Sequence, residues 1–347
     1  MSAVTTHERP GVYSVYTVSA AVTGPARRGT AAIAAQSAGG TVGTVYPITS
    51  YAQAAEAFGE SDGLTVLVKL MLANGAGKVL ATPVRTSDYA AAFALLAAQE
   101  EVEVMVCDST SLSVQQALRD SVEGASQVRR ERIAVVCAAA AETAAQMVTR
   151  AMGINSERVV LAGPATASAD TPAGQVAAAV AGAICGESDP AVPLGGAVLR
   201  GIGTLSASLG ESDIDTLVRG GVTPVELVGG KCTVIRGVTT RTRTDGAADA
   251  TWRELTTIRV VDNVVPGIRT ALQTRFNRTK NTAQVRGAIR SQVILELEQR
   301  KAAEIITDYG EVTAEALAEN PTVCLVTFSF TVAHGLNQIW LSAQITV

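Results

Sequence analysis

Short apolar runs that alternate with alanine-rich stretches occupy much of the first half of this chain. The apolar runs predict strands at Thr30–Ala35, Val79–Pro83, Val102–Cys107, Arg132–Cys137 and Val159–Ala162. The intervening stretches predict helices near Tyr51–Phe58, Leu64–Leu72, Tyr89–Gln99, Val114–Gln127, Glu142–Ala151 and Thr171–Ile184. Strands and helices that alternate at this spacing are typical of an α/β domain, a mostly parallel sheet with helices packed on its faces.

The second half of the chain has a different pattern, which predicts an α+β domain. Gly, Pro and Ser are frequent in Gly186–Gly230, so we interpret this segment as loops and a transition between domains. A β run is predicted at Lys231–Thr242, a polar turn at Arg243–Ala250 and a further strand at Val323–Val332. Helices are predicted near Glu254–Asn277 and Thr282–Thr307, and Pro266-Gly267 should kink or interrupt the first of them.

Both ends of the sequence alternate in the manner of a strand. Near one end the β-prone residues are Val12, Tyr13, Val15, Tyr16 and Val18. Near the other, the apolar set on one face is Ile339, Leu341, Ala343, Ile345 and Val347. Neutral, β-prone ends invite pairing with another chain, so we expect two arms that pair with neighbouring copies. The predicted divisions are an N-terminal arm (1–20), an α/β core domain (21–222), an α+β domain (223–335) and a C-terminal arm (336–347).

The composition excludes several classes of function. A net charge of −4 and an isoelectric point near 5.4 offer no electrostatic basis for binding nucleic acid or an anionic membrane. The polar opening Met1–Pro10 does not resemble a signal peptide, and no apolar run reaches the roughly 20 residues that span a bilayer. The five cysteines are far apart, which favours free buried thiols. The two histidines, His7 and His334, are interpreted as packing or solvent-facing residues.

A parallel sheet raises an alternative, an α/β nucleotide-binding enzyme with an appended α+β domain. Its site would lie where the strands end, in the loops Asp108-Ser109-Thr110, Ala138–Ala141 and Gly163-Pro164-Ala165. None of these loops contains a histidine or a glycine-rich fingerprint, and Asp108 is interpreted as a capping or loop residue. Gly75-Ala76-Gly77-Lys78 precedes a strand instead of a helix, so we interpret it as a turn. We predict no catalytic, cofactor-binding or metal-binding residues.

Strings in the C-terminal third resemble the contractile tail sheath proteins of myophages, R-type bacteriocins and related injection machines. In chain order they are Val234-Ile235-Arg236-Gly237-Val238-Thr239-Thr240-Arg241-Thr242, Arg253-Glu254-Leu255-Thr256-Thr257-Ile258-Arg259-Val260-Val261-Asp262, Ile268-Arg269-Thr270-Ala271-Leu272, Lys280-Asn281-Thr282 and Gly335-Leu336-Asn337-Gln338-Ile339. Arg9-Pro10-Gly11-Val12-Tyr13 is similar to the opening of that family.

The resemblance implies a structural subunit and not an enzyme. Sheath subunits stack as hexameric rings, or equivalently as a six-start helix, around an inner tail tube, and their arms add strands to neighbouring subunits. On a baseplate trigger the sheath shortens and drives the tube through a target cell envelope. The implied partners are other copies of the chain, the inner tube protein, and baseplate and tail terminator proteins, without a cofactor. Assembly is expected in the bacterial cytoplasm, as part of a virion tail or a released contractile particle.

The helix near Thr282–Thr307 corresponds to the region that faces the tube in that family. Its apolar stripe predicts a core-facing side, formed by Val285, Ala288, Ile289, Val293 and Leu297. Arg286, Arg290 and Lys301 lie on one flank of the stripe. Two interpretations stay open for these three side chains: a solvated basic edge, or an electrostatic docking site for an acidic tube.

Overall fold

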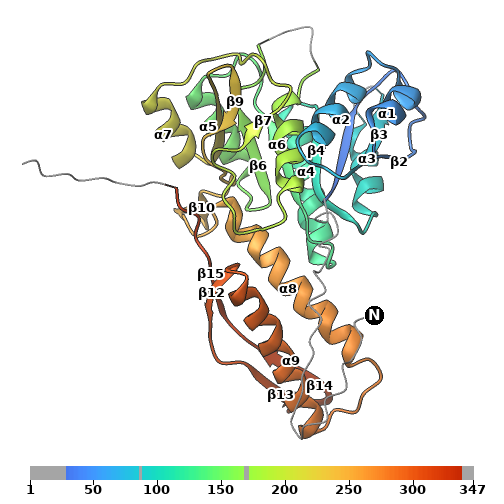
Figure 1. Ribbon diagram of the computed structural model, residues 1–347, viewed down its shortest axis with the longest axis vertical. Helices are drawn as coiled ribbons and strands as arrows, with labels where there is room; N and C mark the ends of the chain where they lie inside the picture. Colours follow the sequence, from blue (N-terminus) through green and yellow to red (C-terminus); the bar gives the residue numbers. More distant parts are fainter. Residues whose placement is uncertain (1–28, 86–87, 168–171, 338–347) are drawn as a thin grey trace, which may run out of the picture.

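The computed structural model describes residues 29–85, 88–167 and 172–337. They form an α/β part built on one large sheet, and an elongated C-terminal part that extends from it along helix α8 (Leu255–Arg275) (Figure 1). The order of elements confirms the predicted fold class, in which an alternating α/β pattern is followed by an α+β pattern.

Among the described residues, nine strands form the central sheet, and its middle is parallel. Strand β1 pairs in parallel with β3 on one side and with β4 on the other. The short strands β2, β9 and β7 pair antiparallel with their neighbours toward the two ends of the sheet. In spatial order the strands are β2 (Tyr46–Ile48), β3 (Lys78–Val84), β1 (Thr30–Gln36), β4 (Val102–Cys107), β5 (Ile133–Cys137), β6 (Val159–Gly163), β8 (Val222–Val228), β9 (Lys231–Val234) and β7 (Val198–Leu199).

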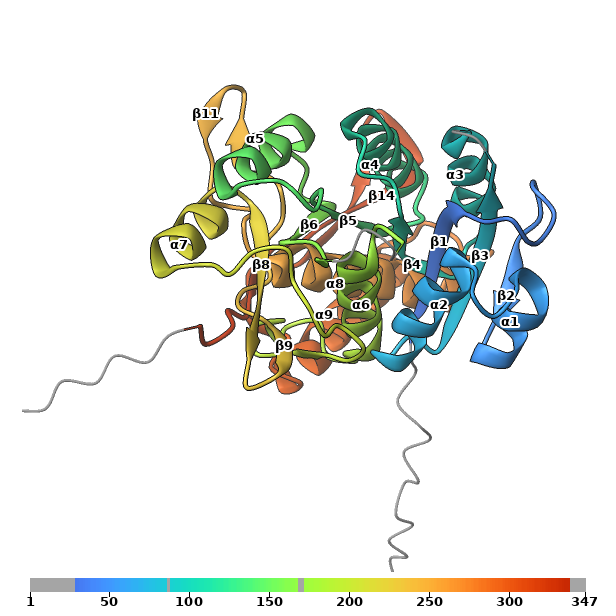
Figure 2. The ribbon, with the colours of Figure 1, turned by 90° about the horizontal axis from the view of Figure 1, so that it is seen from above.

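Helices cover both faces of this sheet, so the α/β part has three layers (Figure 2). Successive residues of a strand point to opposite faces, and in β1 Ile33 packs into one core while Ala32 and Ala34 pack into the other. The Ile33 face is covered by α1 (Tyr51–Phe58), α2 (Gly63–Ala73) and α6 (Gln175–Gly186). The opposite face is covered by α3 (Tyr89–Ala97), α4 (Leu112–Gln127), α5 (Ala144–Ile154) and α7 (Glu211–Arg219).

Small residues let α2 and α6 approach each other closely. A Cβ atom added to Gly182 of α6 would overlap the carbonyl oxygen of Met71 in α2. A Cβ atom on Gly186 would lie 2.9 Å from the Cα of Gly75, which has a φ of +125° that favours glycine. Gly75 therefore belongs to a tight turn between α2 and β3, as the sequence predicts for this segment.

The loop interpretation of Gly186–Gly230 is wrong for its second half. This segment contains β7, helix α7 and strand β8, and β8 pairs in parallel with β6 inside the sheet. The glycines that suggested a loop lie at the ends of these elements, because Gly220 caps α7 and Gly229 begins the turn into β9. Strands β8 and β9 thus both belong to the central sheet, while the predicted division into domains stays a prediction.

Helix α8 joins the two parts of the molecule because its side chains enter two different cores. Leu255 and Ile258 pack into the core of the α/β part. Val264 and Ile268, further along the helix, pack into the small C-terminal core. The helix runs through Pro266 as one element, so the predicted interruption does not occur. The buried residues on both sides of Pro266 hold the helix in place although proline removes one of its hydrogen bonds.

Helix α9 (Ala283–Ala302) is shorter than predicted. Glu304 has a φ of +58°, and the N–H groups of Glu304 and Ile305 donate to the carbonyl oxygens of Lys301 and Arg300 at 3.0 and 2.9 Å. These two bonds form a Schellman motif, which ends the helix and turns the chain. The residues that follow form strand β12 (Ile306–Tyr309), so the prediction that the helix continued to Thr307 is wrong.

The strands that follow α9 form one long antiparallel ribbon that packs on this helix. Strand β12 pairs with β15 (Phe330–Val332), and β13 (Thr313–Leu317) pairs with β14 (Asn320–Thr327). The Gly310 N–H donates to the Ser329 carbonyl oxygen at 2.9 Å between these two pairs. The single strand predicted at Val323–Val332 is thus divided into β14 and β15, because the ribbon is irregular at this point. The polar turn at Arg243–Ala250 is a short hairpin of β10 (Arg243–Thr244) and β11 (Ala247–Ala248).

Candidate assembly surfaces

The ribbon presents two strand edges. Within the described part of the chain, each of its strands has a single strand neighbour. One edge is therefore formed by β12 and β13, and the other by β14 and β15. An edge of this kind exposes backbone N–H and C=O groups that can pair with another extended chain. The ribbon also exposes apolar side chains on its outer face, where Leu325 is 53% exposed and Val323 is 39% exposed.

The small core under the ribbon is incompletely covered. Val293 and Leu297 of α9 are fully buried together with Val264 of α8. The ribbon residues Val326, Phe328, Phe330 and Val332 pack against these residues but stay only partly buried. The C-terminal part thus has apolar surface left at the β14–β15 side of the ribbon, where a further strand would bury it.

The terminal segments that we expect to act as arms lie outside the described residues. This applies to Val12, Tyr13, Val15, Tyr16 and Val18, and to Ile339, Leu341, Ala343, Ile345 and Val347. Their assignment stays a prediction from the sequence pattern.

Arg286 and Arg290 of α9 hold other parts of the C-terminal domain, which the sequence does not predict. Arg290 Nε donates to the Val312 carbonyl oxygen at 2.8 Å. Arg286 Nη1 donates to Asn281 Oδ1 at 3.1 Å. Lys301, near the other end of the helix, forms an exposed ion pair with Asp308 at 2.8 Å. The structure therefore places the three residues on one helix but gives each a partner of its own.

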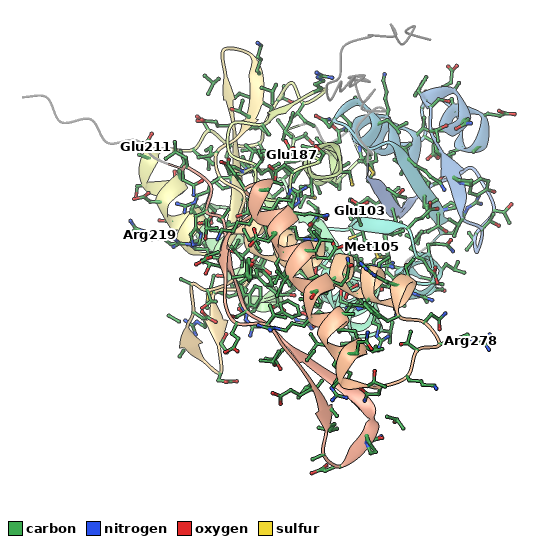
Figure 3. The ribbon with its side chains drawn as sticks, turned by 60° about the horizontal axis from the view of Figure 1, so that its bottom comes forward. Glu103, Met105, Glu187, Glu211, Arg219 and Arg278 are labelled. Atoms are coloured by element: carbon green, nitrogen blue, oxygen red, sulfur yellow. The ribbon has the colours of Figure 1, made fainter. Side chains whose placement is uncertain are left out.

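The loop between α8 and α9 is basic. No acidic residue occurs between Asp262 and Glu296, whereas this stretch contains Arg269, Arg275, Arg278, Lys280, Arg286 and Arg290. Arg278 lies in this loop, remote from Glu211 and Arg219 on α7 (Figure 3). Only Arg269 of this set pairs with a carboxylate among the described residues, at 2.7 Å from Glu131. The other five side chains form no direct ion pair in the described chain.

Ion pairs join α8 to the α/β part. Arg158, just before β6, binds both carboxylate oxygens of Asp262, at 2.8 and 3.0 Å. Burial raises the pKa of the Asp262 carboxyl, and the Arg158 hydrogen bonds oppose this shift. Arg259 Nη2 donates to the carbonyl oxygens of Ile184 and Glu187 at 3.2 and 2.8 Å, at the end of α6. These contacts fix α8 to two elements of the sheet layer.

The segment Val234–Thr242, one of the strings that resemble sheath proteins, wraps around the same end of the sheet. Thr223 Oγ1 accepts from the Val238 N–H at 2.9 Å and donates to the Val238 carbonyl oxygen at 2.9 Å. Thr240 Oγ1 accepts from the Ser156 N–H at 3.0 Å. Strand β9 ends at Val234, so the predicted β run is shorter than expected. Beyond it the backbone makes only single bonds to strands, from the Ile235 N–H to the Pro224 carbonyl oxygen of β8 at 2.9 Å and from the Thr240 N–H to the Val159 carbonyl oxygen of β6 at 2.8 Å.

The loops at the carboxyl ends of β4, β5 and β6 surround a cavity of about 230 Å³. Its walls are formed mainly by small residues such as Ala139, Ala165 and Gly174, with Thr110 and Thr166. Cys137 also lines it, but burial raises the pKa of its thiol to about 12, so the reactive thiolate is scarce at neutral pH. The cavity therefore offers little chemistry for catalysis.

Asp108 lies at the same edge of the sheet and has a structural role. Its carboxylate accepts from the Gln36 N–H at 3.0 Å and from Tyr89 Oη at 2.6 Å, which ties β4 to β1 and α3. Burial raises the pKa of Asp108, while these hydrogen bonds oppose the shift. It does not cap α4, because Ser111 is the residue at that position.

The described residues also bear on a membrane span and on a metal site. None of their helices is both long and apolar enough to cross a bilayer. No group of three or more His, Cys, Asp or Glu side chains within residues 29–85, 88–167 and 172–337 is placed to hold a metal ion. His334 is exposed, and His7 lies outside the described residues.

Solved structures of sheath proteins share this fold over nearly the whole chain. A chain of the anti-feeding prophage (AFP) baseplate, 6-fold symmetrised, matches with a TM-score of 0.74 and 16% identity, covering 99% of this chain and 100% of that chain. A chain of the AFP helical sheath in its contracted state gives a TM-score of 0.72 and 16% identity, with 96% and 98% covered. The sheath tail protein from Desulfitobacterium hafniense gives a TM-score of 0.68 and 12% identity, with 93% and 100% covered.

Family models agree with this fold. Comparison with curated protein sequences gave no significant match. The model of the phage tail sheath protein central domain matches residues 82–240, and the model of the phage tail sheath C-terminal domain matches residues 247–346. The two matches follow each other in the order of that family and together span most of the chain, so this protein belongs to the phage tail sheath family of contractile injection systems.

Proposed function

We propose that this chain is the self-assembling subunit of a contractile sheath, which polymerises as stacked hexamers through strand exchange and encloses an inner tail tube. The observation that carries the proposal is the antiparallel ribbon formed by β12, β13, β14 and β15. Its two edges have no strand neighbour in the described residues. The chain has two terminal segments with strand-like alternation, 12–18 and 339–347, so the number of strands it could donate equals the number of ribbon edges. Main-chain hydrogen bonds provide affinity in such strand addition, and alternate side chains provide specificity.

Strand exchange explains how such a polymer can change shape without coming apart. Arms that link each subunit to more than one neighbour raise the effective concentration of every contact, so the mesh holds together even when a single donated strand binds weakly. Contraction then requires the folded body to reorient as a unit. The contacts of α8 support this, because Asp262 and Arg259 tie the C-terminal part to the sheet layer. Energy for contraction is stored in the extended lattice, and no nucleotide is hydrolysed.

The inner tube is the proposed partner of the C-terminal part. The basic stretch from Arg275 to Arg290 supports docking on an acidic surface, because it contains no acidic residue and its side chains form no direct ion pair in the described chain. Arg286, Arg290 and Lys301 remain the proposed docking residues, although each also has a partner within the subunit. Baseplate and tail terminator proteins would cap the two ends of the polymer. We propose assembly in the bacterial cytoplasm, as part of a virion tail or a released contractile particle.

The alternative of an α/β nucleotide-binding enzyme has less support. Such an enzyme needs polar groups that converge on the strand ends. The cavity at that edge is lined mainly by Ala, Gly and Thr, and Asp108 is engaged with Gln36 and Tyr89. A structural role without catalysis is therefore the function that we propose.

Electron microscopy of the purified protein, together with size-exclusion chromatography, tests the proposal. Hollow striated cylinders with six-fold end views are the expected result, either from the protein alone or after addition of an inner tube protein. A monodisperse monomer in both conditions would overturn it.

Deletion of residues 1–18 tests strand exchange separately. The shortened chain should give the same circular dichroism spectrum and melting temperature as the folded full-length subunit, but no long polymers. Polymers of normal length from this deletion would count against the arms. As a matched control, replacing residues 1–18 by a scrambled sequence of the same composition should fail to polymerise in the same way.

A further inference from the structure

Asn281, in the loop between α8 and α9, binds the tip of the β13–β14 hairpin. Its Nδ2 donates to the carbonyl oxygens of Pro321 and Val323 at 2.7 and 3.2 Å. Its Oδ1 accepts from Arg286 at 3.1 Å. Both polar atoms of this side chain, Oδ1 and Nδ2, thus have hydrogen-bond partners. The bond from Arg286 to Oδ1 orients the amide so that Nδ2 faces β14.

The part of β14 that Asn281 contacts is a bulge. Ala316 pairs with Cys324, but the next residue of β13, Leu317, pairs with Asn320. Residues 321–323 therefore have no partner in β13. A bulge leaves backbone groups unpaired and bends the strand, which is one way in which proteins end pairing at an edge.

Three backbone groups of this bulge are withdrawn from pairing. The carbonyl oxygens of Pro321 and Val323 are occupied by Asn281. Pro321 has no N–H group, and the N–H of Thr322 donates to Asn320 Oδ1 at 3.1 Å. An incoming strand would find neither free carbonyl oxygens at 321 and 323 nor N–H donors at 321 and 322. Beyond this point, from Cys324 to Val332, no backbone partner other than β13, β12 and Gly310 is present in the described chain.

We propose that Asn281 is a register stop for strand addition: residues 339–347 of a second copy pair along Cys324–Val332 of the β14–β15 edge and cannot slide past Val323. This inference rests on the strand exchange proposed above. Residues 339–347 are chosen because their apolar set, such as Leu341 and Ile345, would extend the incompletely covered core at Val326 and Phe330. A slip by one residue would turn that set away from the core. A contact that fixes the register therefore keeps these apolar side chains buried.

Cross-linking to the native Cys324 can measure the register. Cys324 is half-buried in β14, while Cys107, Cys137, Cys185 and Cys232 are buried. Leu341→Cys, Ala343→Cys, Ile345→Cys and Val347→Cys would each be made in the full-length protein, and the assembled polymers oxidised. A disulfide requires Cβ atoms about 3.5–4.5 Å apart, so only a residue opposite or next to Cys324 can react. One position is expected to give at least five times the cross-linked dimer of the others.

Asn281→Asp removes the donors but keeps the shape of the side chain. Its carboxylate would still bind Arg286 but could not donate to Pro321 and Val323, so the bulge loses its clamp. In this background the cross-links are expected to spread over two or more positions. Thr282→Ala is the matched control: it removes the side chain that caps α9, which bonds to the Val285 N–H at 3.3 Å, yet leaves the Asn281 contacts in place. It should lower the melting temperature and keep a single register.

The outcomes separate this inference from the proposed function. Polymers that cross-link at the same single position with and without Asn281→Asp would overturn the register stop. Polymers without any cross-link to Cys324 would overturn the choice of residues 339–347 as the donated strand. Absence of polymers from the parent protein, even with tube protein added, would instead contradict the proposed function itself.

Discussion

Arg158 and Asp262 form a doubly hydrogen-bonded ion pair that connects the sheet to the helix leading into the C-terminal part. Both side chains are largely buried, at 13% and 17% exposure. Because α8 supplies residues to both cores, this pair lies at the junction between the two parts of the subunit.

Removing one member of this pair should destabilise the fold strongly. Asp262→Ala leaves the Arg158 guanidinium partly buried without its carboxylate, and the free energy of unfolding should fall by about 3–5 kcal/mol. Urea denaturation followed by circular dichroism measures this loss. Asp215→Ala is the control, because the Asp215–Arg219 pair on α7 is exposed and should contribute less than about 0.5 kcal/mol. Equal losses from the two substitutions would show that the Arg158–Asp262 pair has no special role.

The Arg269–Glu131 pair should make stability depend on pH in the acid range. Burial alone would raise the pKa of Glu131, but the Arg269 hydrogen bond and charge outweigh it, so the pKa lies below its ordinary value. The folded state therefore binds this proton less readily than the unfolded state, and the pair stabilises the fold above the ordinary pKa of about 4.3. That contribution is lost as the pH falls through the lower, folded pKa.

A comparison with Glu131→Gln isolates this effect. The difference in unfolding free energy between the parent and the variant should be largest near pH 7 and shrink below pH of about 4. Urea midpoints measured between these pH values test it. A difference that stays constant, or that grows as the pH falls, would contradict the assignment.

Glycine at position 182 should be required by the packing of α2 against α6. In Gly182→Ala the new methyl group would overlap the carbonyl oxygen of Met71, and α2 can yield only by moving its backbone. We expect a loss of about 1–3 kcal/mol in unfolding free energy. Gly124→Ala in α4 is the matched control, because nothing lies within 4 Å of the added atom. It should stabilise the protein by about 0.5–1 kcal/mol. Thermal unfolding of both variants shows whether the overlap with Met71 outweighs the higher helix propensity of alanine at position 182.

The proposed tube-docking residues can be tested by neutral substitution. A variant with Arg286→Gln, Arg290→Gln and Lys301→Gln should co-sediment with an acidic inner tube at least about tenfold less well, since each exposed ionic contact contributes on the order of 0.2–1 kcal/mol and many subunits act together. The control is Arg219→Gln on α7, a residue that is 76% exposed and far from α9. A melting curve must show that the triple variant still folds, because Arg290 also bonds to Val312. Unchanged co-sedimentation of the folded triple variant would rule out these residues.

Local signals in the sequence determined the elements that are bounded by capping residues. Helix α1 has the predicted bounds because the Ser50 side chain accepts from the Gln53 N–H and Gly59 adopts a φ of +102° beyond its last residue. Strand β4 also has its predicted bounds, since a short apolar run can be read without knowledge of its neighbours. The family was likewise readable from short strings such as Val234–Thr242, and the family models agree with it.

Long-range contacts decided the rest. Strand β8 joined the sheet because β6 lay beside it, although its own sequence contains a proline and is flanked by glycines. The Schellman turn at Glu304 ended α9 where its apolar pattern continued into Ile305 and Ile306, which pack into the small core instead. The role of Asn281 depends on a hairpin tip 40 residues away along the chain. Periodicity and capping act within a few residues and can be read from one strand or helix, whereas pairing, register and the partner of a buried charge depend on which distant segment the fold brings alongside.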